Sequence, residues 1–140
     1  MNTISSKDLE NIDKLLLKGF SLLRTREFDK SISIANKILT EKALQLNLTQ
    51  NFGVRLIRSI VLASLKKYDQ VNEEIKIGEK ILDKMDNKEK ENILVKEGEG
   101  RLLSIKGAVQ TANGDLEGAL VSYHQSLKQF ESLSNKKSPM

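Results

Sequence analysis

The sequence contains no cysteine, one histidine and one proline in 140 residues. Without cysteine the chain can form neither a disulfide nor a thiolate metal site, which suits a reducing compartment. The scarcity of proline, together with many Leu, Ile, Lys and Glu residues, favours helices. No apolar run reaches the roughly 18 residues that span a bilayer, and the polar N-terminal segment MNTISSKDLENID is unlike a signal peptide. We therefore expect one all-α domain in the cytoplasm, with no membrane segment.

The positive charge of the chain is dispersed. The net charge is +4, with eight basic and six acidic side chains in residues 1–50. Residues 51–100 carry ten of each sign, and residues 101–140 carry five and three. Nucleic-acid binding requires concentrated positive charge, so this distribution favours a solvated surface. A binder of nucleic acid or another anionic partner stays open as the alternative function, through Lys18, Arg24, Arg55, Arg58, Arg101 and Lys106.

The stretch Arg101–Leu133 has the clearest helical pattern. A turn at Asn113-Gly114-Asp115 separates two segments, because glycine adopts a left-handed backbone at low cost and Asp115 can cap the following helix. A small residue, Gly107, lies within the first segment. Apolar residues recur in the second segment at steps of three and four, at Leu116, Ala119, Leu120, Tyr123, Leu127, Phe130 and Leu133. The pattern predicts a helical hairpin.

A similar stretch begins near the N-terminus. Ser5 and Asp8 have the spacing of a capping box, which places the start of the first helix near Lys7. A polar break at residues 25–27 separates this helix from a second one that begins at Phe28. We expect the second helix to end between residues 42 and 47.

A third stretch lies between these two. Thr49 or Asn51 can cap its first helix, and two lysines at residues 66–67 close that helix, since positive charge is favourable at a helix C-terminus. Tyr68 begins the second helix. The polar run at residues 86–92 is either the link to the last hairpin or the exposed start of a long helix.

The three stretches align with one another. Segments 16–20, 56–60 and 104–108 match, and each holds a small residue followed nine positions later by an apolar residue and an acid. The small residues are Gly19, Ser59 and Gly107, and the apolar ones are Phe28, Tyr68 and Leu116. Contacts are predicted at Ser31, Val71 and Ala119 and one turn later at Ala35, Ile75 and Tyr123. A small residue allows two helices to approach closely, and the later residue packs against the next hairpin.

This pattern resembles the tetratricopeptide repeat. Residues 114–127, Gly-Asp-Leu-x-x-Ala-Leu-x-x-Tyr-x-x-Ser-Leu, carry the resemblance best. The copies are spaced 40 and 48 residues apart (Ser31 to Val71 to Ala119), against the family's usual ~34, and so resemble long-helix variants of prokaryotic signalling and regulator proteins. The resemblance implies three antiparallel hairpins, at about 6–47, 49–86 and 88–135, stacked as a short right-handed α-solenoid of about six helices. A flexible tail at 136–140 would follow.

The resemblance also implies a protein-interaction scaffold without catalysis. Its groove would be lined by the first helix of each hairpin and would bind a protein or peptide, in particular the apolar face of a helix. Carried over residue by residue, the groove positions are Asp13, Leu16, Phe20, Leu23 and Arg24, then Gly53, Leu56, Ile60, Ala63 and Ser64, then Arg101, Ser104, Ala108, Thr111 and Ala112. The alternative is that Phe20 and its neighbours are core residues covered by the chain itself.

No constellation of residues predicts chemistry. His124 has no nearby acid in sequence and is interpreted as a solvated surface residue. The acidic clusters Glu73-Glu74, Glu89/Glu91 and Glu97/Glu99 are interpreted as solvated helix faces. Alternate helix residues point about 200° apart, so Glu97 and Glu99 cannot chelate one ion together. The glycines lack a phosphate-loop pattern. We expect no catalytic residues, no metal and no cofactor.

The last helix is predicted to leave an apolar patch in water. The sides of Tyr123, Leu127 and Phe130 that their own hairpin does not use have no following helix in the sequence to cover them. We expect either self-association through this hairpin or a longer parent protein. The alternative is that the helix before Gly107 folds over the patch.

Overall fold

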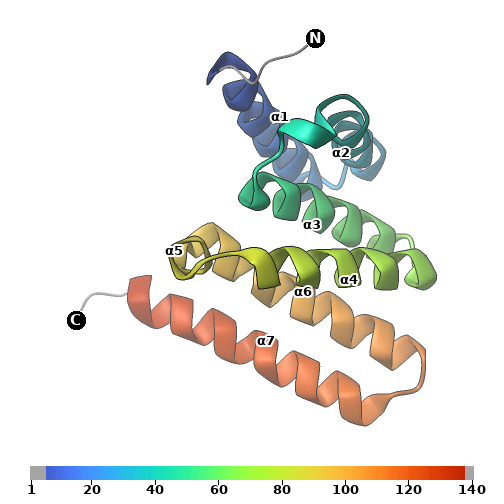
Figure 1. Cartoon of the computed structure of the whole chain (residues 1–140). Helices are drawn as coiled ribbons and strands as arrows, with labels where there is room; N and C mark the ends of the chain where they lie inside the picture. Colours follow the sequence, from blue (N-terminus) through green and yellow to red (C-terminus); the bar gives the residue numbers. More distant parts are fainter. Residues whose placement is uncertain (1–5, 138–140) are drawn as a thin grey trace.

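The computed structural model describes residues 6–137, and side chains from residue 11 to residue 134. Within this range the chain is helical and has no strands, which confirms the all-α prediction. The elements are α1 (Ser6–Arg24), α2 (Phe28–Lys42), a 3-10 turn (Ala43–Gln45), α3 (Leu48–Ser64), α4 (Tyr68–Lys84), α5 (Asn87–Glu91), α6 (Ile93–Ala112) and α7 (Leu116–Lys137) (Figure 1). The proposed capping residue Ser5 and residues 138–140 lie outside the described part. Residues 136 and 137, expected in a tail, are helical.

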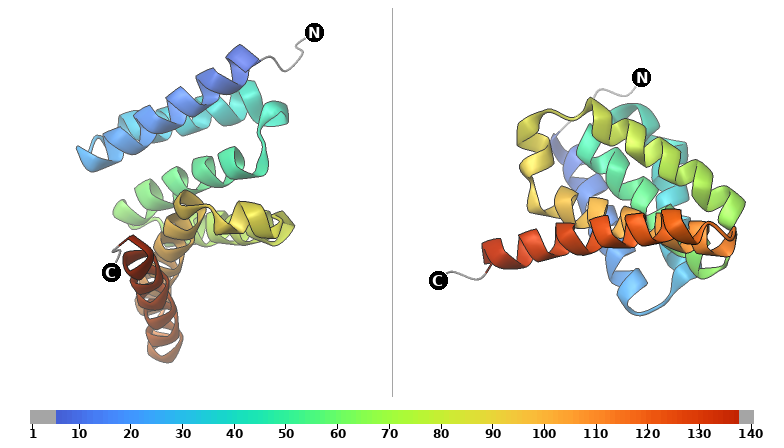
Figure 2. Two further views of the ribbon diagram at one scale, coloured as in Figure 1. Left: turned by 90° about the vertical axis from the view of Figure 1, so that its left-hand side faces the viewer. Right: turned by 90° about the horizontal axis from the view of Figure 1, so that it is seen from below.

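The long helices form consecutive antiparallel pairs. α1 packs on α2, α3 on α4 and α6 on α7, and the pairs follow one another in chain order (Figures 1 and 2). Both helices of the first pair contact α3, and both helices of the second pair contact α6. The first two pairs are therefore each covered by the first helix of the next pair.

The three turns inside the pairs share one backbone geometry. Arg26, Lys66 and Gly114 occupy equivalent positions and have φ angles of 60°, 60° and 82°. In each turn this residue donates its N–H to the carbonyl three residues earlier, and the next residue donates to the carbonyl five residues earlier. This is the Schellman arrangement, which satisfies the last carbonyls of a helix. The repetition seen in the sequence is therefore present in the backbone.

Side chains cap the helices, although not always at the predicted residue. Asn47, rather than Thr49 or Asn51, caps α3, because Asn47 Oδ1 accepts from Gln50 N at 2.7 Å and Gln50 Oε1 accepts from Asn47 N at 3.1 Å. Asp115 does cap α7, with Oδ1 accepting from Gly118 N at 2.9 Å, as predicted. Local pattern alone does not decide among neighbouring polar residues.

The polar run at 86–92 is neither a plain link nor the start of α6. Asp86 and Glu89 form a capping box that begins the short helix α5. Asn92 then breaks the chain and starts α6, its side chain accepting from Leu94 N at 2.8 Å.

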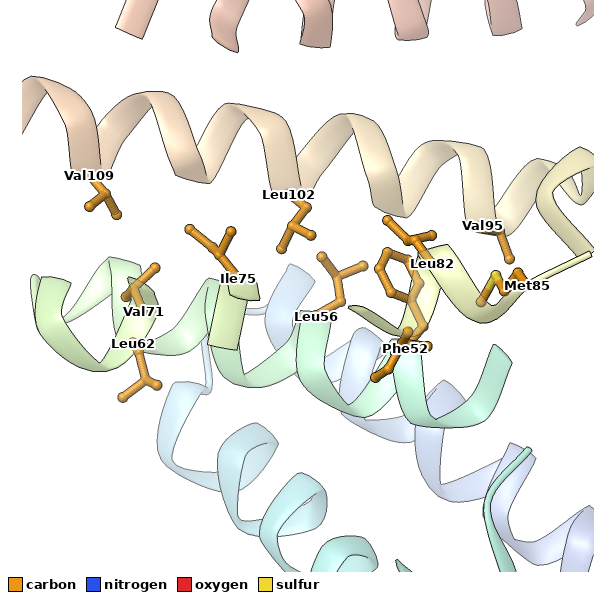
Figure 3. Close-up of a cluster of buried hydrophobic side chains, with 11 residues drawn as sticks. Phe52, Leu56, Leu62, Val71, Ile75, Leu82, Met85, Val95, Leu102 and Val109 are labelled. Atoms are coloured by element: carbon orange, nitrogen blue, oxygen red, sulfur yellow. The ribbon is translucent and has the colours of Figure 1, made fainter. Parts of the chain in front are cut away.

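The buried apolar residues form two clusters, each made by one pair and the following first helix. The first cluster joins α1 and α2 to α3 through Ile12, Leu16, Ala35, Ile38, Val54, Ile57 and Val61. The second joins α3 and α4 to α6. In Figure 3, Val95, Leu102 and Val109 of α6 point toward the side chains of α3 and α4. Burial of these side chains removes apolar surface from water and so holds successive pairs together.

The left-handed turn residues generate a stability prediction. Lys66 has no side-chain hydrogen bond in the structure and is held at φ 60°, where a non-glycine residue costs about 1 kcal/mol. We expect Lys66→Gly to raise the free energy of unfolding by roughly 1 kcal/mol in urea titrations followed by circular dichroism.

Lys67→Gly is the matched control. It removes the same charge one residue later, where φ is −88°, so it gains no relief of strain. We expect it to lower stability by up to about 1 kcal/mol through added backbone freedom. Equal effects of the two substitutions would contradict the assigned turn geometry.

Candidate partner-binding groove

The first helices of the three pairs lie side by side in the order α1, α3, α6. Glycines set the spacing between them. A Cβ atom at Gly53 of α3 would lie 3.6 Å from the Leu16 methyl groups, and one at Gly98 of α6 would lie 2.6 Å from the ring of Phe52. Large side chains of each first helix thus reach the backbone of the next. The result is a continuous row of first helices.

An open hollow of about 540 Å³ lies between α3 and α6 on this row. Ile60, Ala63 and Ile105 give it aliphatic walls. The polar side chains of Ser64, Arg101 and Ser104 also line it. The ring of Phe130, from α7, completes the lining. Apolar and polar groups thus contribute about equally to the lining, and mixed surfaces of this kind are common in protein interfaces.

The hollow brings together part of the predicted groove. Ile60, Arg101 and Ser104 line it, as do Ala63 and Ser64. Sequence reasoning missed Ile105, although it lies inside the aligned segment 104–108, because its side of α6 depends on how α6 crosses α3. Phe130 was assigned only to the outer patch of the last helix. Its ring lies against Gly100, which places it at the edge of the hollow.

Other predicted groove residues lie elsewhere. Leu16 and Leu56 are 9% and 5% exposed and belong to the two core clusters, so assigning them to a binding surface is corrected. Phe20 is half-buried and packs against both clusters. For these residues the alternative interpretation, a core covered by the chain itself, describes the structure.

Four further predicted positions, Leu23, Arg24, Ala108 and Thr111, do not line the hollow. Leu23 is half-buried against the first cluster, and Ala108 is half-buried on α6. Arg24 and Thr111 are exposed, and Thr111 Oγ1 donates to the carbonyl of Gly107 at 2.9 Å. Of the predicted groove, the structure therefore retains only the part between α3 and α6.

The segment Glu97-Gly98-Glu99-Gly100 packs on two opposite neighbours. Gly98 faces Phe52 of α3, whereas a Cβ at Gly100 would lie 3.0 Å from the ring of Phe130 of α7. Glu99 is half-buried, and its Oε1 accepts from Gln129 Nε2 at 2.9 Å. The interpretation of these acids as a solvated helix face is therefore corrected. The alternate glycines Gly98 and Gly100 allow α6 to pack closely against α3 on one side and α7 on the other.

Glu74 also departs from its predicted solvated state. It is 5% exposed and lies between two arginines of α3. Arg55 Nη1 donates to both of its oxygens, at 3.2 and 3.3 Å, and Arg58 Nε lies 3.1 Å from Oε1. Arg58 also donates to Asn36 Oδ1 of α2. A buried carboxylate needs such partners, and here they connect three helices.

These ion pairs bear on nucleic-acid binding. Of the six cations considered for it, Arg55 and Arg58 hold Glu74, and Lys106 Nζ lies 3.0 Å from Glu79 Oε2. Cations that face acidic side chains contribute less to binding phosphates. Lys18, Arg24 and Arg101 are exposed. The structure does not favour the alternative function.

The described residues offer little for other chemistry. His124 is exposed. Among the residues that the structure describes, no three His, Asp or Glu side chains are grouped to hold a metal ion. Over the same residues, no helix has the length and apolar character to cross a membrane.

Comparisons with family models, with curated proteins and with solved structures find no match to this chain. The resemblance to tetratricopeptide repeats therefore stays a prediction from the residues. Internal repetition is nevertheless visible in the three equivalent turns and in the two core clusters.

The two glycines that space the first helices give opposite predictions. At Gly53 an added Cβ makes ordinary contacts of 3.6 to 3.8 Å, so Gly53→Ala should raise stability by roughly 0.5–1 kcal/mol through helix propensity. At Gly98 the Cβ would meet the ring of Phe52, which is 3% exposed and has no room to move.

We expect Gly98→Ala to lower stability by roughly 1–2 kcal/mol, because overpacking outweighs the gain in propensity. Both values are obtained from urea unfolding of the two variants. If Gly98→Ala proved stabilising, α3 and α6 would not approach as closely as described.

Proposed function

We propose that this chain is a non-catalytic protein-interaction scaffold of the cytoplasm, built as a short right-handed solenoid of tetratricopeptide-like hairpins. The proposed binding site is the hollow between α3 and α6. One observation carries the proposal: Ile60, Ala63 and Ile105 present aliphatic surface in an open hollow on the row of first helices. The equivalent turns and the coverage of each pair by the next first helix support the solenoid.

The shape and chemistry of the hollow favour a helical segment as the partner. Its volume of about 540 Å³ suits two or three apolar side chains, such as a helix presents at steps of three and four. Arg101 is exposed at the rim and can pair with a carboxylate of the partner. The preferred ligand is thus an amphipathic helix with apolar anchors and an acidic residue beside them.

A substitution that fills the hollow tests this proposal. Ser104→Tyr adds a bulky side chain at a half-buried lining position without removing any core residue. Ser33→Tyr, on an exposed position of α2, makes the same chemical change away from the hollow. The immobilised proteins are incubated with cell lysate, in parallel with and without nuclease treatment, and the retained proteins are quantified by mass spectrometry.

We expect one or a few proteins to be retained by the unmodified chain and by Ser33→Tyr. The retained amount of these proteins should fall at least about tenfold with Ser104→Tyr, as it does for substitutions at the centre of an interface. Circular dichroism and thermal unfolding establish that both variants are folded. Retention that is unchanged by Ser104→Tyr would contradict the proposed site. Retention lost on nuclease treatment would favour nucleic acid instead.

A further inference from the structure

The helix α7 carries an exposed apolar stripe, which we define as Leu116, Leu120, Tyr123, Leu127 and Phe130. These side chains are 37% to 71% exposed. They recur at steps of four, three, four and three, so they lie along one face of the helix in the pattern of a coiled-coil seam. Monomeric proteins seldom leave such a continuous apolar face in water. The helix itself lies at one end of the row of helices (Figures 1 and 2).

Two members of the α7 stripe, Tyr123 and Phe130, are the counterparts of residues that are buried in other pairs. Tyr123 aligns with Ala35 of α2 and Ile75 of α4, which are 0% and 2% exposed, whereas Tyr123 is 41% exposed. Phe130, 37% exposed, aligns with Leu82 of α4, which is 8% exposed. The following first helix covers α2 and α4. At these two positions the stripe therefore corresponds to interfaces already present in the molecule.

Among the described residues, the other end of the molecule offers the stripe only a partly apolar surface. In α3 the residues that face the preceding pair include Val54, Ile57 and Val61. The aligned residues of α1 are Lys14, Leu17 and Ser21, all exposed, and two of them are polar. A head-to-tail stack of copies would bury these two polar groups against the stripe, which is less favourable than a contact between apolar residues alone.

The stripe is, however, complementary to itself. Around Tyr123 its members lie at −7, −3, +4 and +7, a nearly palindromic spacing. If two α7 helices pack antiparallel about a two-fold axis near Tyr123, Leu116 meets Phe130 of the second copy and Leu120 meets Leu127. Such an isologous contact closes on itself and stops at a dimer. The stripe runs about 21 Å along the helix.

The neighbouring helix leaves room for this contact. Gly100, Ser104 and Ala108 of α6 align with Phe52, Leu56 and Ile60 of α3. In α3 these large residues pack against the next first helix, α6, whereas in α6 small residues take their place. At these positions α6 therefore has less apolar surface than α3 for packing against another helix. The small residues also leave space for a helix that packs on α7.

We propose that two copies of this chain associate tail to tail through the α7 stripe, with their α7 helices antiparallel. The proposal is independent of the partner-binding hollow, although Phe130 contributes to both. A contact formed by a single stripe of five residues is expected to be weak, with a dissociation constant of about 1–100 μM. Exposed Glu117 and Glu131 on the edge of the stripe come close between copies, so added salt should strengthen the dimer.

Sedimentation equilibrium of the full chain from about 1 to 500 μM tests the proposal. We expect a monomer–dimer equilibrium without larger species. Leu127→Glu should weaken dimerisation at least about 100-fold, because it places a charge within the seam. Val121→Glu is the matched control, since Val121 is on the same helix and both side chains are 57% exposed, but Val121 lies off the stripe. Leu127 does not line the hollow, so the outcome of this experiment does not bear on the proposed binding site in the hollow.

The orientation is measured with spin labels, because the chain has no cysteine and a single introduced one is labelled uniquely. One label is attached to His124→Cys, at a position near the proposed axis. The other is attached to Glu131→Cys, one heptad further along the helix. For antiparallel helices, the separation of the two labels along the helix axis is about 21 Å larger at residue 131 than at residue 124, so the measured distance must be clearly longer at residue 131.

Four outcomes would overturn the proposal: a monomer at every concentration, growth beyond a dimer, equal distances at the two labels, or equal effects of Leu127→Glu and Val121→Glu. Thermal unfolding of both glutamate variants at low concentration establishes that any loss of dimer is not a loss of fold.

Discussion

Each helical pair in this molecule has more apolar surface than its own two helices can bury. This constraint organises the rest of the structure. The side chains on the outer face of α2 are buried largely by α3, and those of α4 largely by α6. Since burial contributes about 25 cal/mol per Å², the stability of each pair depends on the helix that follows. Glycines at the crossing points, Gly53 and Gly98, let the helices come close enough for this coverage.

The same constraint creates the two surfaces available to other molecules. Because α3 and α6 meet through Phe52 and Gly98 at one end, their other ends leave the hollow near Ile60 and Ile105. Because α7 is followed by no helix within the described residues, its outer face stays exposed. The hollow lies between two helices, whereas the α7 stripe runs along one helix.

Much of the architecture could be predicted from the sequence, because repetition and turn chemistry are local. The break at residues 25–27, the turn at Asn113-Gly114 and the cap at Asp115 are predictable. Features that depend on how distant helices cross are not. Leu16 and Leu56 look like groove residues until the next first helix is placed over them. Glu74 looks solvated because its arginine partners lie 19 and 16 positions earlier in the chain.

The dependence of each pair on the next helix is tested most directly by native-state amide hydrogen exchange at a concentration where the chain is monomeric. We predict that amides of α4, covered by α6, exchange only through global unfolding. Those in the middle of α7 should open more easily, by more than about 1 kcal/mol, because α7 packs mainly on α6 and no following helix covers it within the described residues. Equal opening free energies for α4 and α7 would contradict the idea that coverage by a following helix stabilises each pair.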